Sequence, residues 1–276
     1  MLRQYIVSNS EALTVAGQSR MLFQLIQVSL KITNSTRIYA QDSLINAFVS
    51  TVTFEDSELY NMNLQDTSIQ VTSTTLNFTN MNVHDVLDPN NVDLIVLGLD
   101  SEFTISNVMY SNSDSVLFDL RSSSVQASNL TFENITNVNN LFTLYDAYDS
   151  DVSAVEVKNV TTTEDSLFDV RSSSGITFRD FSLGYIENTV IKIVKSSFAE
   201  ISNMKIHHST KAISITQSVV DLISDSEFTD NGNIGVINGG AINIMNGQVN
   251  ILNSTFSGNT AHTGAAISFD CSSLEI

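Results

Sequence analysis

Proline, cysteine and tryptophan are scarce in this sequence, and the scarcity of proline and cysteine limits the structures that the chain can form. The 276 residues contain one Pro, one Cys and no Trp. A single Pro suits a chain that is mostly hydrogen-bonded strand, because Pro cannot donate to a strand ladder. The lone cysteine, Cys271, has no partner for a disulfide within this sequence, so we interpret it as a plain core or surface residue.

Basic residues and long apolar runs are also few. Lys and Arg number 12 against 30 Asp and Glu, which gives a formal net charge of −18. This charge repels phosphate backbones and anionic lipids, so nucleic acids and acidic membranes are not expected as partners, whereas cations, basic partners and neutral glycans are compatible with it. The most apolar early stretch, residues 21–30, is too short and too polar to span a bilayer, and no signal-peptide pattern begins the chain.

What the sequence does contain is a repeat. The segments Phe118–Ser124 and Phe168–Ser174 are nearly identical and lie fifty residues apart, a distance of two repeats. A pattern of apolar, any, apolar, any, Asn or Asp, any, any, apolar recurs at steps of 21 to 30 residues. Its Asn and Asp positions are Asn34, Asp56, Asn80, Asn107, Asn129, Asn159, Asp180, Asn203, Asp225 and Asn253.

The repeat has a direct physical interpretation. Alternation at period two directs every second side chain of a strand to the interior. Asn and Asp tolerate the left-handed backbone of a corner, and stacked copies can hydrogen-bond along a ladder. One further apolar strand per repeat, such as residues 116–120 and 167–170, brings the number to three, and insertions are expected at residues 84–91, 145–153 and 229–239.

The sequence therefore predicts an all-β chain that forms one domain over residues 1–276. The fold is a right-handed parallel β-helix, a solenoid with three strands per coil and about 10–11 coils. Both ends resemble interrupted coils, so we expect the domain to be a fragment of a longer chain or a subunit whose ends are covered by another copy.

The last two coils carry the most specific motifs. Phe228–Asn231 is followed by Gly239–Ile242, and Phe256–Asn259 is followed by Gly264–Ile267. These segments resemble the paired F-x-x-N and G-G-A-[ILV] motifs of polymorphic outer membrane protein repeats, a family of chlamydial autotransporter adhesins with similar repeats in large protist surface proteins. The resemblance implies a surface or secreted location and an adhesive or structural role without catalysis. It covers about the last fifty residues; the rest resembles the general pectin-lyase-like coil.

Six N-x-[ST] sequons raise the question of glycosylation. Those at Asn34, Asn129, Asn159 and Asn253 coincide with the predicted ladder, where an engaged amide is a poor acceptor. Asn77 lies between two inward residues and is expected to point outward, and Asn134 follows the corner strand. We therefore expect glycosylation at Asn77 and Asn134 before the four ladder residues.

An enzyme requires carboxylates on one face, and Asp119 and Asp169 are the candidates. Both point outward if Phe118 and Phe168 point inward, and they lie two coils, or roughly 9–10 Å, apart, at the upper edge of the spacing for an inverting glycosidase pair. However, each Asp is followed two residues later by an Arg, which is typical of a surface ion pair. The polygalacturonase-like and pectate-lyase-like motifs are absent.

Metal sites and cofactors are weakly indicated. One inserted loop contains Asp146, Asp149 and Asp151, and another contains Asp85, Asp88 and Asp93. Their oxygen atoms suit Ca²⁺, but neither loop matches an EF-hand or the Gly-Gly-x-Gly-x-Asp nonapeptide, and solvated acidic loops are the simpler interpretation. The four histidines, His84, His207, His208 and His262, lack metal-ligand spacing and are expected at the surface. We expect no cofactor.

Together these features predict a non-catalytic extracellular or cell-surface scaffold, such as an adhesin, stalk or fibre subunit. Its expected partners are other copies of the chain, stacked end to end, other parts of a larger surface protein, and glycans. The alternative is a polysaccharide-active enzyme, a glycoside hydrolase or lyase of pectin-lyase-like fold, with Asp119 and Asp169 as acid and base.

Overall fold

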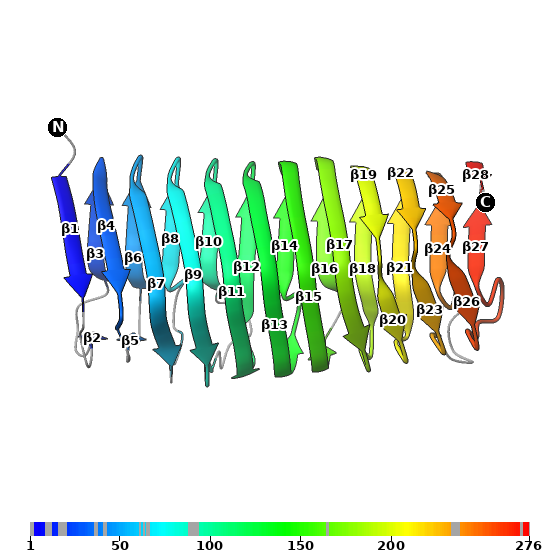
Figure 1. Cartoon of the computed structure of the whole chain (residues 1–276), viewed down its shortest axis with the longest axis horizontal. Helices are drawn as coiled ribbons and strands as arrows, with labels where there is room; N and C mark the ends of the chain where they lie inside the picture. Colours follow the sequence, from blue (N-terminus) through cyan, green and yellow to red (C-terminus); the bar gives the residue numbers. More distant parts are fainter. Residues whose placement is uncertain are drawn as a thin grey trace.

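The computed structural model is an elongated stack of parallel strands (Figure 1). It describes residues 3–8, 13–15, 21–35, 38–40, 43–60, 62, 64, 67–87, 94–163, 166–232, 238–270 and 273–275. Within these ranges all regular structure is strand, and there is no helix that could cross a membrane. Strands β1 (Arg3–Ser8) and β28 (Ser273–Glu275) lie at opposite ends of the rod.

One side of the rod is a parallel sheet of 11 strands, to which each coil contributes one strand. Neighbouring strands follow one another at intervals of one coil, so the chain winds once around the rod between them. The fold is the right-handed parallel β-helix that the sequence predicts, with the winding sense that parallel crossovers adopt in about 98% of cases. The strands are β3 (Met21–Ile26), β6 (Ser43–Phe48), β8 (Ile69–Thr72), β10 (Leu94–Leu99), β12 (Val116–Arg121), β14 (Phe142–Tyr145), β16 (Ser166–Arg171), β18 (Thr189–Val194), β21 (Lys211–Thr216), β24 (Ile242–Met245) and β27 (Ile267–Asp270).

The remaining strands form a second parallel sheet of 17 strands that wraps around the other sides. In the central coils one long strand bends through the corner, and in the later coils the same path is divided into two short strands. The three strand segments predicted per coil are therefore continuous in places. Besides β1 and β28, the strands are β2 (Leu13–Val15), β4 (Val28–Thr33), β5 (Ile38–Ala40), β7 (Thr51–Tyr60), β9 (Thr75–His84), β11 (Glu102–Ser113), β13 (Ser124–Val138), β15 (Tyr148–Thr162), β17 (Ser174–Gly184), β19 (Ser197–Ser202), β20 (Lys205–His207), β22 (Val219–Ser224), β23 (Glu227–Thr229), β25 (Gln248–Leu252) and β26 (Thr255–Ser257).

Each coil turns at residues with positive φ, which align in three rows along the rod. The first corner row is Asn34, Asp56, Asn80, Asn107, Asn129, Ala154, Asp180, Asn203, Asp225 and Asn253. The second corner row is Asp85, Asn112, Asn134, Asn159, Tyr185, His208, Asp230 and Gly258. The third corner row is Gln27, Val49, Ser73, Asp100, Ser122, Asp146, Ser172, Lys195, Gln217 and Asn246.

Amide side chains of the first corner row bond from coil to coil. Asn80 Nδ2 donates to Asp56 Oδ1 at 2.8 Å, Asn107 Nδ2 to Asn80 Oδ1 at 2.8 Å, and Asn129 Nδ2 to Asn107 Oδ1 at 2.7 Å. Asn203 and Asn253 donate in the same way to the aspartates one coil before them, each at 2.5 Å. The row therefore combines a backbone requirement, tolerance of positive φ, with a side-chain ladder.

One assignment within this row is corrected by the structure. The sequence pattern places Asn159 in the first corner row, but the pairing of β13 with β15 puts Ala154 beside Asn129, and Asn159 beside Asn134 in the second corner row. The steps around Ala154 become 25 and 26 residues and replace the outlying steps of 30 and 21. The insertion expected at residues 145–153 is also absent, because β14 ends at Tyr145 and β15 begins at Tyr148.

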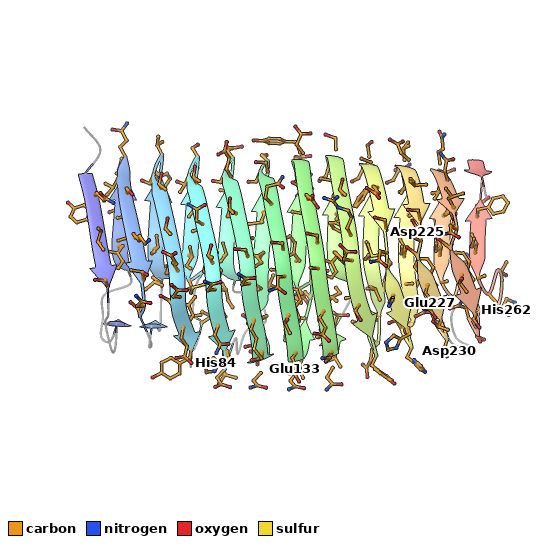
Figure 2. The ribbon with its side chains drawn as sticks, in the orientation of Figure 1. His84, Glu133, Asp225, Glu227, Asp230 and His262 are labelled. Atoms are coloured by element: carbon orange, nitrogen blue, oxygen red, sulfur yellow. The ribbon has the colours of Figure 1, made fainter. Side chains whose placement is uncertain are left out.

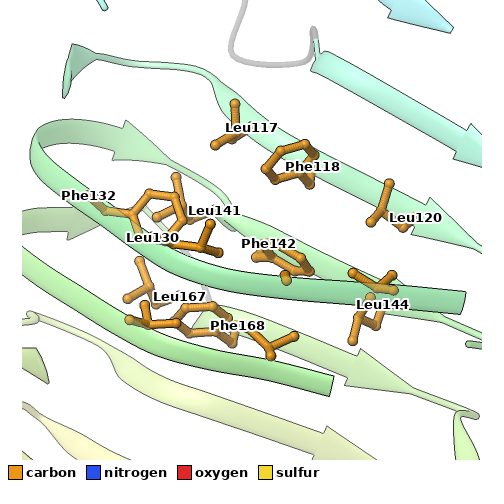
Figure 3. Packing of buried hydrophobic residues seen from close by; sticks show 14 of the residues in the cluster. Leu117, Phe118, Leu120, Leu130, Phe132, Leu141, Phe142, Leu144, Leu167 and Phe168 are labelled. Carbon is orange, nitrogen blue, oxygen red and sulfur yellow. The ribbon is translucent and has the colours of Figure 1, made fainter. Parts of the chain in front are cut away.

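Phenylalanine rings form much of the interior, and rings of neighbouring coils contact one another (Figure 3). The ring centroids of Phe118 and Phe142 are 5.3 Å apart, and those of Phe142 and Phe168 are 6.0 Å apart. Phe168 also contacts the rings of Phe178 and Phe181. Full burial of each such side chain contributes about 1.5–3 kcal/mol, so the core stabilises every coil against its neighbours.

Buried hydroxyl groups satisfy the backbone just after the third corner. Ser123 Oγ accepts the N–H of Ser101 at 3.1 Å and donates to the carbonyl oxygen of Arg121 at 2.7 Å, and Ser196 bonds Ser173 and Val194 in the same way. Each hydroxyl thus hydrogen-bonds one backbone N–H and one backbone carbonyl group, which would be costly to leave unpaired in the interior. The members are Ser50, Thr74, Ser101, Ser123, Ser173, Ser196 and Ser218.

The F-x-x-N motif has a comparable structural explanation. The rings of Phe228 and Phe256 stack with centroids 5.1 Å apart. Asn231 is fully buried: its Oδ1 accepts the N–H of Ser209 at 3.1 Å, and its Nδ2 donates to the carbonyl oxygen of Ile206 at 2.8 Å. Asn259 bonds the backbone of the Asn231 coil in the same way. The motif is an internal ladder of one ring and one amide per coil.

The corner geometry predicts a stabilising substitution at Ala154. This exposed residue has a φ of 53°, a conformation that costs most residues roughly 1–2 kcal/mol but suits Asn. Ala154→Asn also fills the gap in the amide ladder between Asn129 and Asp180. We expect the free energy of unfolding, measured by urea denaturation, to rise by about 1 kcal/mol.

The matched control is Ser128→Asn, at an exposed strand position whose φ is not positive. An equal gain in both variants, or no gain at Ala154, would contradict the ladder explanation.

Candidate functional site

Two carboxylates stand on the outward side of the 11-stranded sheet. Strand pairing sets Asp119 of β12, Thr143 of β14 and Asp169 of β16 in line on three consecutive coils. The inward neighbours Phe118 and Phe168 are buried in the core, so alternation along each strand directs the aspartates outward.

Each aspartate is held by the arginine two residues later. Asp119 accepts hydrogen bonds from Nε and Nη2 of Arg121 at 3.1 and 2.7 Å, and Asp169 from Nε and Nη2 of Arg171 at 2.9 and 2.6 Å. The aspartates are only 8% and 2% exposed, so these are not the solvated surface pairs that the sequence suggests. The hydrogen bonds and charge of Asp119 raise the pKa of Arg121, which keeps its guanidinium charged.

Both pairs border a single open cavity of about 340 Å³. Thr143 and Tyr145 of the intervening coil and the side chain of Asn140 complete its lining. The carboxylates are two strand spacings, or roughly 9–10 Å, apart, as the sequence predicts. The cavity offers bound carboxylates, two half-exposed guanidinium groups and a tyrosine ring.

The sequons lie in different environments. Asn34, Asn129 and Asn253 are in the first corner row. Asn159 and also Asn134 are in the second corner row, where Asn159 Nδ2 donates to Asn134 Oδ1 at 3.2 Å. The argument that disfavours ladder residues as acceptors therefore extends to Asn134. Asn77 lies outside the corner rows in β9, half-buried, with its Nδ2 3.4 Å from Thr53 Oγ1.

Most described aspartates of the two acidic clusters occupy corner positions or bond to an arginine. Asp146 is in the third corner row, Asp149 also has positive φ, and Asp151 is hydrogen-bonded by Arg179. Asp85 is in the second corner row, and Asp88, Asp93 and Cys271 lie outside the described residues. Within the described part of the chain, no three His, Cys, Asp or Glu side chains are grouped so that they could hold a metal ion.

His84 has two acidic partners. Its Nε2 lies 2.7 Å from Glu58 Oε1 and its Nδ1 lies 2.8 Å from Asp85 Oδ2, and the ring of Tyr60 packs 5.9 Å away. Partial burial lowers the pKa of His84, but the hydrogen bonds and charges of the two carboxylates outweigh it and raise the pKa above 6.5. The imidazolium form is thus favoured in the folded protein.

A pH-dependent stability follows from this shift. The stabilisation by His84 is fully present below pH about 6.5, the pKa of the unfolded state, and is lost as pH rises through the raised folded pKa. We expect the free energy of unfolding to fall more between pH 6 and pH 8.5 in the native protein than in His84→Gln. Urea titrations at both pH values measure this, with the exposed His262→Gln as the control. Equal pH dependence in the native protein and His84→Gln would refute the assignment.

One cluster was missed by the sequence analysis. Tyr185, His207 and His208 come together at the second corner, with ring centroids 5.0 to 5.5 Å apart. The available signal is the constant offset of five residues between the first and second corners, as between Asn107 and Asn112. Applied to Asp180 and Asn203, this offset identifies positions 185 and 208 as corner residues.

Comparisons with known proteins find structures of similar fold but no related sequence. No protein-family model matches the sequence, and neither does any curated protein. The structure is similar to bacteriophage CBA120 tailspike protein 3, with 8% identity, a TM-score of 0.45 and coverage of 98% of this chain and 50% of the tailspike. The chain thus spans about half the length of that protein.

Two further similar structures belong to proteins of different kinds. One is the A-module of the mannuronan C-5 epimerase AlgE6 from Azotobacter vinelandii, with 10% identity, a TM-score of 0.40 and coverage of 90% and 91% of the two chains. The other is PfbA, a surface adhesin of Streptococcus pneumoniae, with 10% identity, a TM-score of 0.36 and coverage of 87% and 85%. Values this low assign neither an activity nor a partner to the chain.

Proposed function

We propose that the chain is a non-catalytic β-helix scaffold of an extracellular or cell-surface protein. The observation that carries this proposal is the state of its two candidate catalytic carboxylates. Both oxygen atoms of Asp119 and both of Asp169 accept hydrogen bonds from an arginine of the same strand. Each carboxylate is thus neutralised within its own strand, and at 8% and 2% exposure both are poorly accessible to a sugar. Separating either pair to free a carboxylate would cost several kcal/mol.

The rest of the molecule supports a structural role. The aromatic contacts that run from Phe54 to Phe198, the amide ladders and the buried hydroxyls all stabilise the stacking of coils. The F-x-x-N segments ending at Asn231 and Asn259 contribute to the same stacking, which fits the proposed relation to surface-protein repeats. Labelling of intact source cells with an antibody against the chain tests the surface location.

The second candidate is a polysaccharide-active enzyme, and one observation favours it. Asp119 and Asp169 line the same cavity, two coils apart, at the upper edge of the spacing of an inverting carboxylate pair. The arginines beside them could then bind an acidic sugar instead of the aspartates.

A turnover assay separates the two candidates. The chain is incubated with a panel of neutral and uronate polysaccharides, and new reducing ends and unsaturated products are measured. We expect no product above a blank without protein. Turnover that is lost in both Asp119→Asn and Asp169→Asn, while Asp221→Asn retains it, would overturn the scaffold proposal in favour of the enzyme.

A further inference from the structure

Tyr185 is an exception in the second corner row. Its φ is 61°, and its side chain is 62% exposed. A bulky residue in this conformation costs roughly 1–3 kcal/mol, and such outliers cluster at binding and active sites. The same corner is formed by Asn112, Asn134 and Asn159 in the three preceding coils. The fold alone therefore favours Asn at this position and does not explain the tyrosine ring.

The surrounding residues hold the ring in a defined position. The ring of Tyr185 stacks on that of His208 with centroids 5.0 Å apart and an angle of 17°, and it meets His207 edge-on at 5.5 Å. Gly184 makes room for His207, because a Cβ atom at Gly184 would lie 2.2 Å from the His207 ring. The Nδ1 atoms of the two histidines are 3.1 Å apart, so one ring donates a hydrogen bond to the other.

Tyr185 also lines two hollows in the surface. The hollow towards the N-terminal coils has a volume of about 310 Å³, and its lining includes the ion pair of Glu156 and Lys158, 2.6 Å apart. The hollow towards the C-terminal coils has a volume of about 470 Å³, and its lining includes Thr210 and Asp230. Asp230 lies on the same edge of the rod as His84 and Glu133 (Figure 2).

We propose that Tyr185 is the stacking platform of a binding site for a neutral glycan. Sugar rings present C–H groups on one face, which pack against an aromatic ring, and hydroxyl groups around the rim, which need hydrogen-bond partners. The two hollows that Tyr185 borders supply such partners, Glu156 and Lys158 in one and Asp230 in the other. Anionic sugars are disfavoured, because the chain carries a net charge of −18 and carboxylates line both hollows.

This inference rests on the proposed function, since the glycan is held and not converted. The site lies at the second corner, on residues that do not line the cavity of Asp119 and Asp169. Binding and turnover are therefore separable by substitution.

The test is binding of a panel of neutral hexasaccharides, namely gluco-, galacto-, manno-, xylo- and N-acetylgluco-oligosaccharides, measured by titration calorimetry with hexauronates for comparison. We expect at least one neutral hexasaccharide to bind and its affinity to fall at least tenfold in Tyr185→Asn. Tyr185→Phe keeps the ring and is expected to bind within about threefold of the native protein. Tyr148→Asn removes an exposed tyrosine elsewhere and is expected to leave binding unchanged.

Stability measurements distinguish this site from a structural role. Because Asn suits the corner, Tyr185→Asn is expected to unfold at the same or a higher urea concentration than the native protein while losing the glycan. A destabilised Tyr185→Asn would show that the ring serves the fold and would overturn the proposal.

Three binding results would also overturn it. These are no binding of any neutral hexasaccharide, equal binding by Tyr185→Asn, and binding of hexauronates alone. Stabilisation by Zn²⁺ that is lost in His207→Ala, without glycan binding, would identify a metal site instead. Turnover of a bound glycan that is lost in Asp119→Asn would contradict the scaffold function, and the tenfold loss of affinity in Tyr185→Asn would still support the binding site.

Discussion

Parallel backbone pairing at a fixed register is the interaction on which every other feature of this structure depends. It places each residue directly beside its equivalent in the next coil, at about 4.8 Å. A residue type that recurs once per coil thus becomes a continuous row. The amide ladder from Asn80 to Asn129, the ring contacts from Phe118 to Phe168 and the buried hydroxyls from Ser101 to Ser123 are all consequences of this one constraint.

The same constraint explains where function is to be sought. A row whose members share one residue type serves the stack, so a member that differs from such neighbours marks a position to examine for another role. Ala154 is one such position, because it leaves a gap in the amide ladder between Asn129 and Asp180. Tyr185 is a second, because its ring packs on His208 and borders two hollows. Asp119 and Asp169 are a different case, because each carboxylate is neutralised by an arginine of its own strand.

The all-β solenoid and most of the first corner row were predictable from the sequence, because period-two alternation and the tolerance of Asn and Asp for positive φ are local properties. The register at Ala154 was not. The strand that follows the first corner alternates in the same way as the strand before it, so Val155, Val157 and Asn159 reproduce the pattern five residues late. The burial of the hydroxyl rows could not be predicted either, because the sequence does not distinguish a serine that bonds the buried backbone from one that faces water. At the candidate site, the alignment of Asp119 with Asp169 followed from the repeat, whereas their burial and the two-bond geometry of their arginine pairs did not.

Disulfide cross-linking tests the register most directly. In a Cys271→Ser background, Ala154→Cys is combined with Asp180→Cys, and Asn159→Cys is combined with the same Asp180→Cys. Adjacent strands bring the first pair to about 4.8 Å between Cα atoms, within the range of 4.4–6.8 Å that disulfides require, and leave the second pair a strand segment apart. Mild oxidation is expected to form the 154–180 disulfide in the first variant and to leave both cysteines of the second variant as free thiols. Rapid formation of the 159–180 disulfide in the second variant, with no disulfide in the first, would contradict the register.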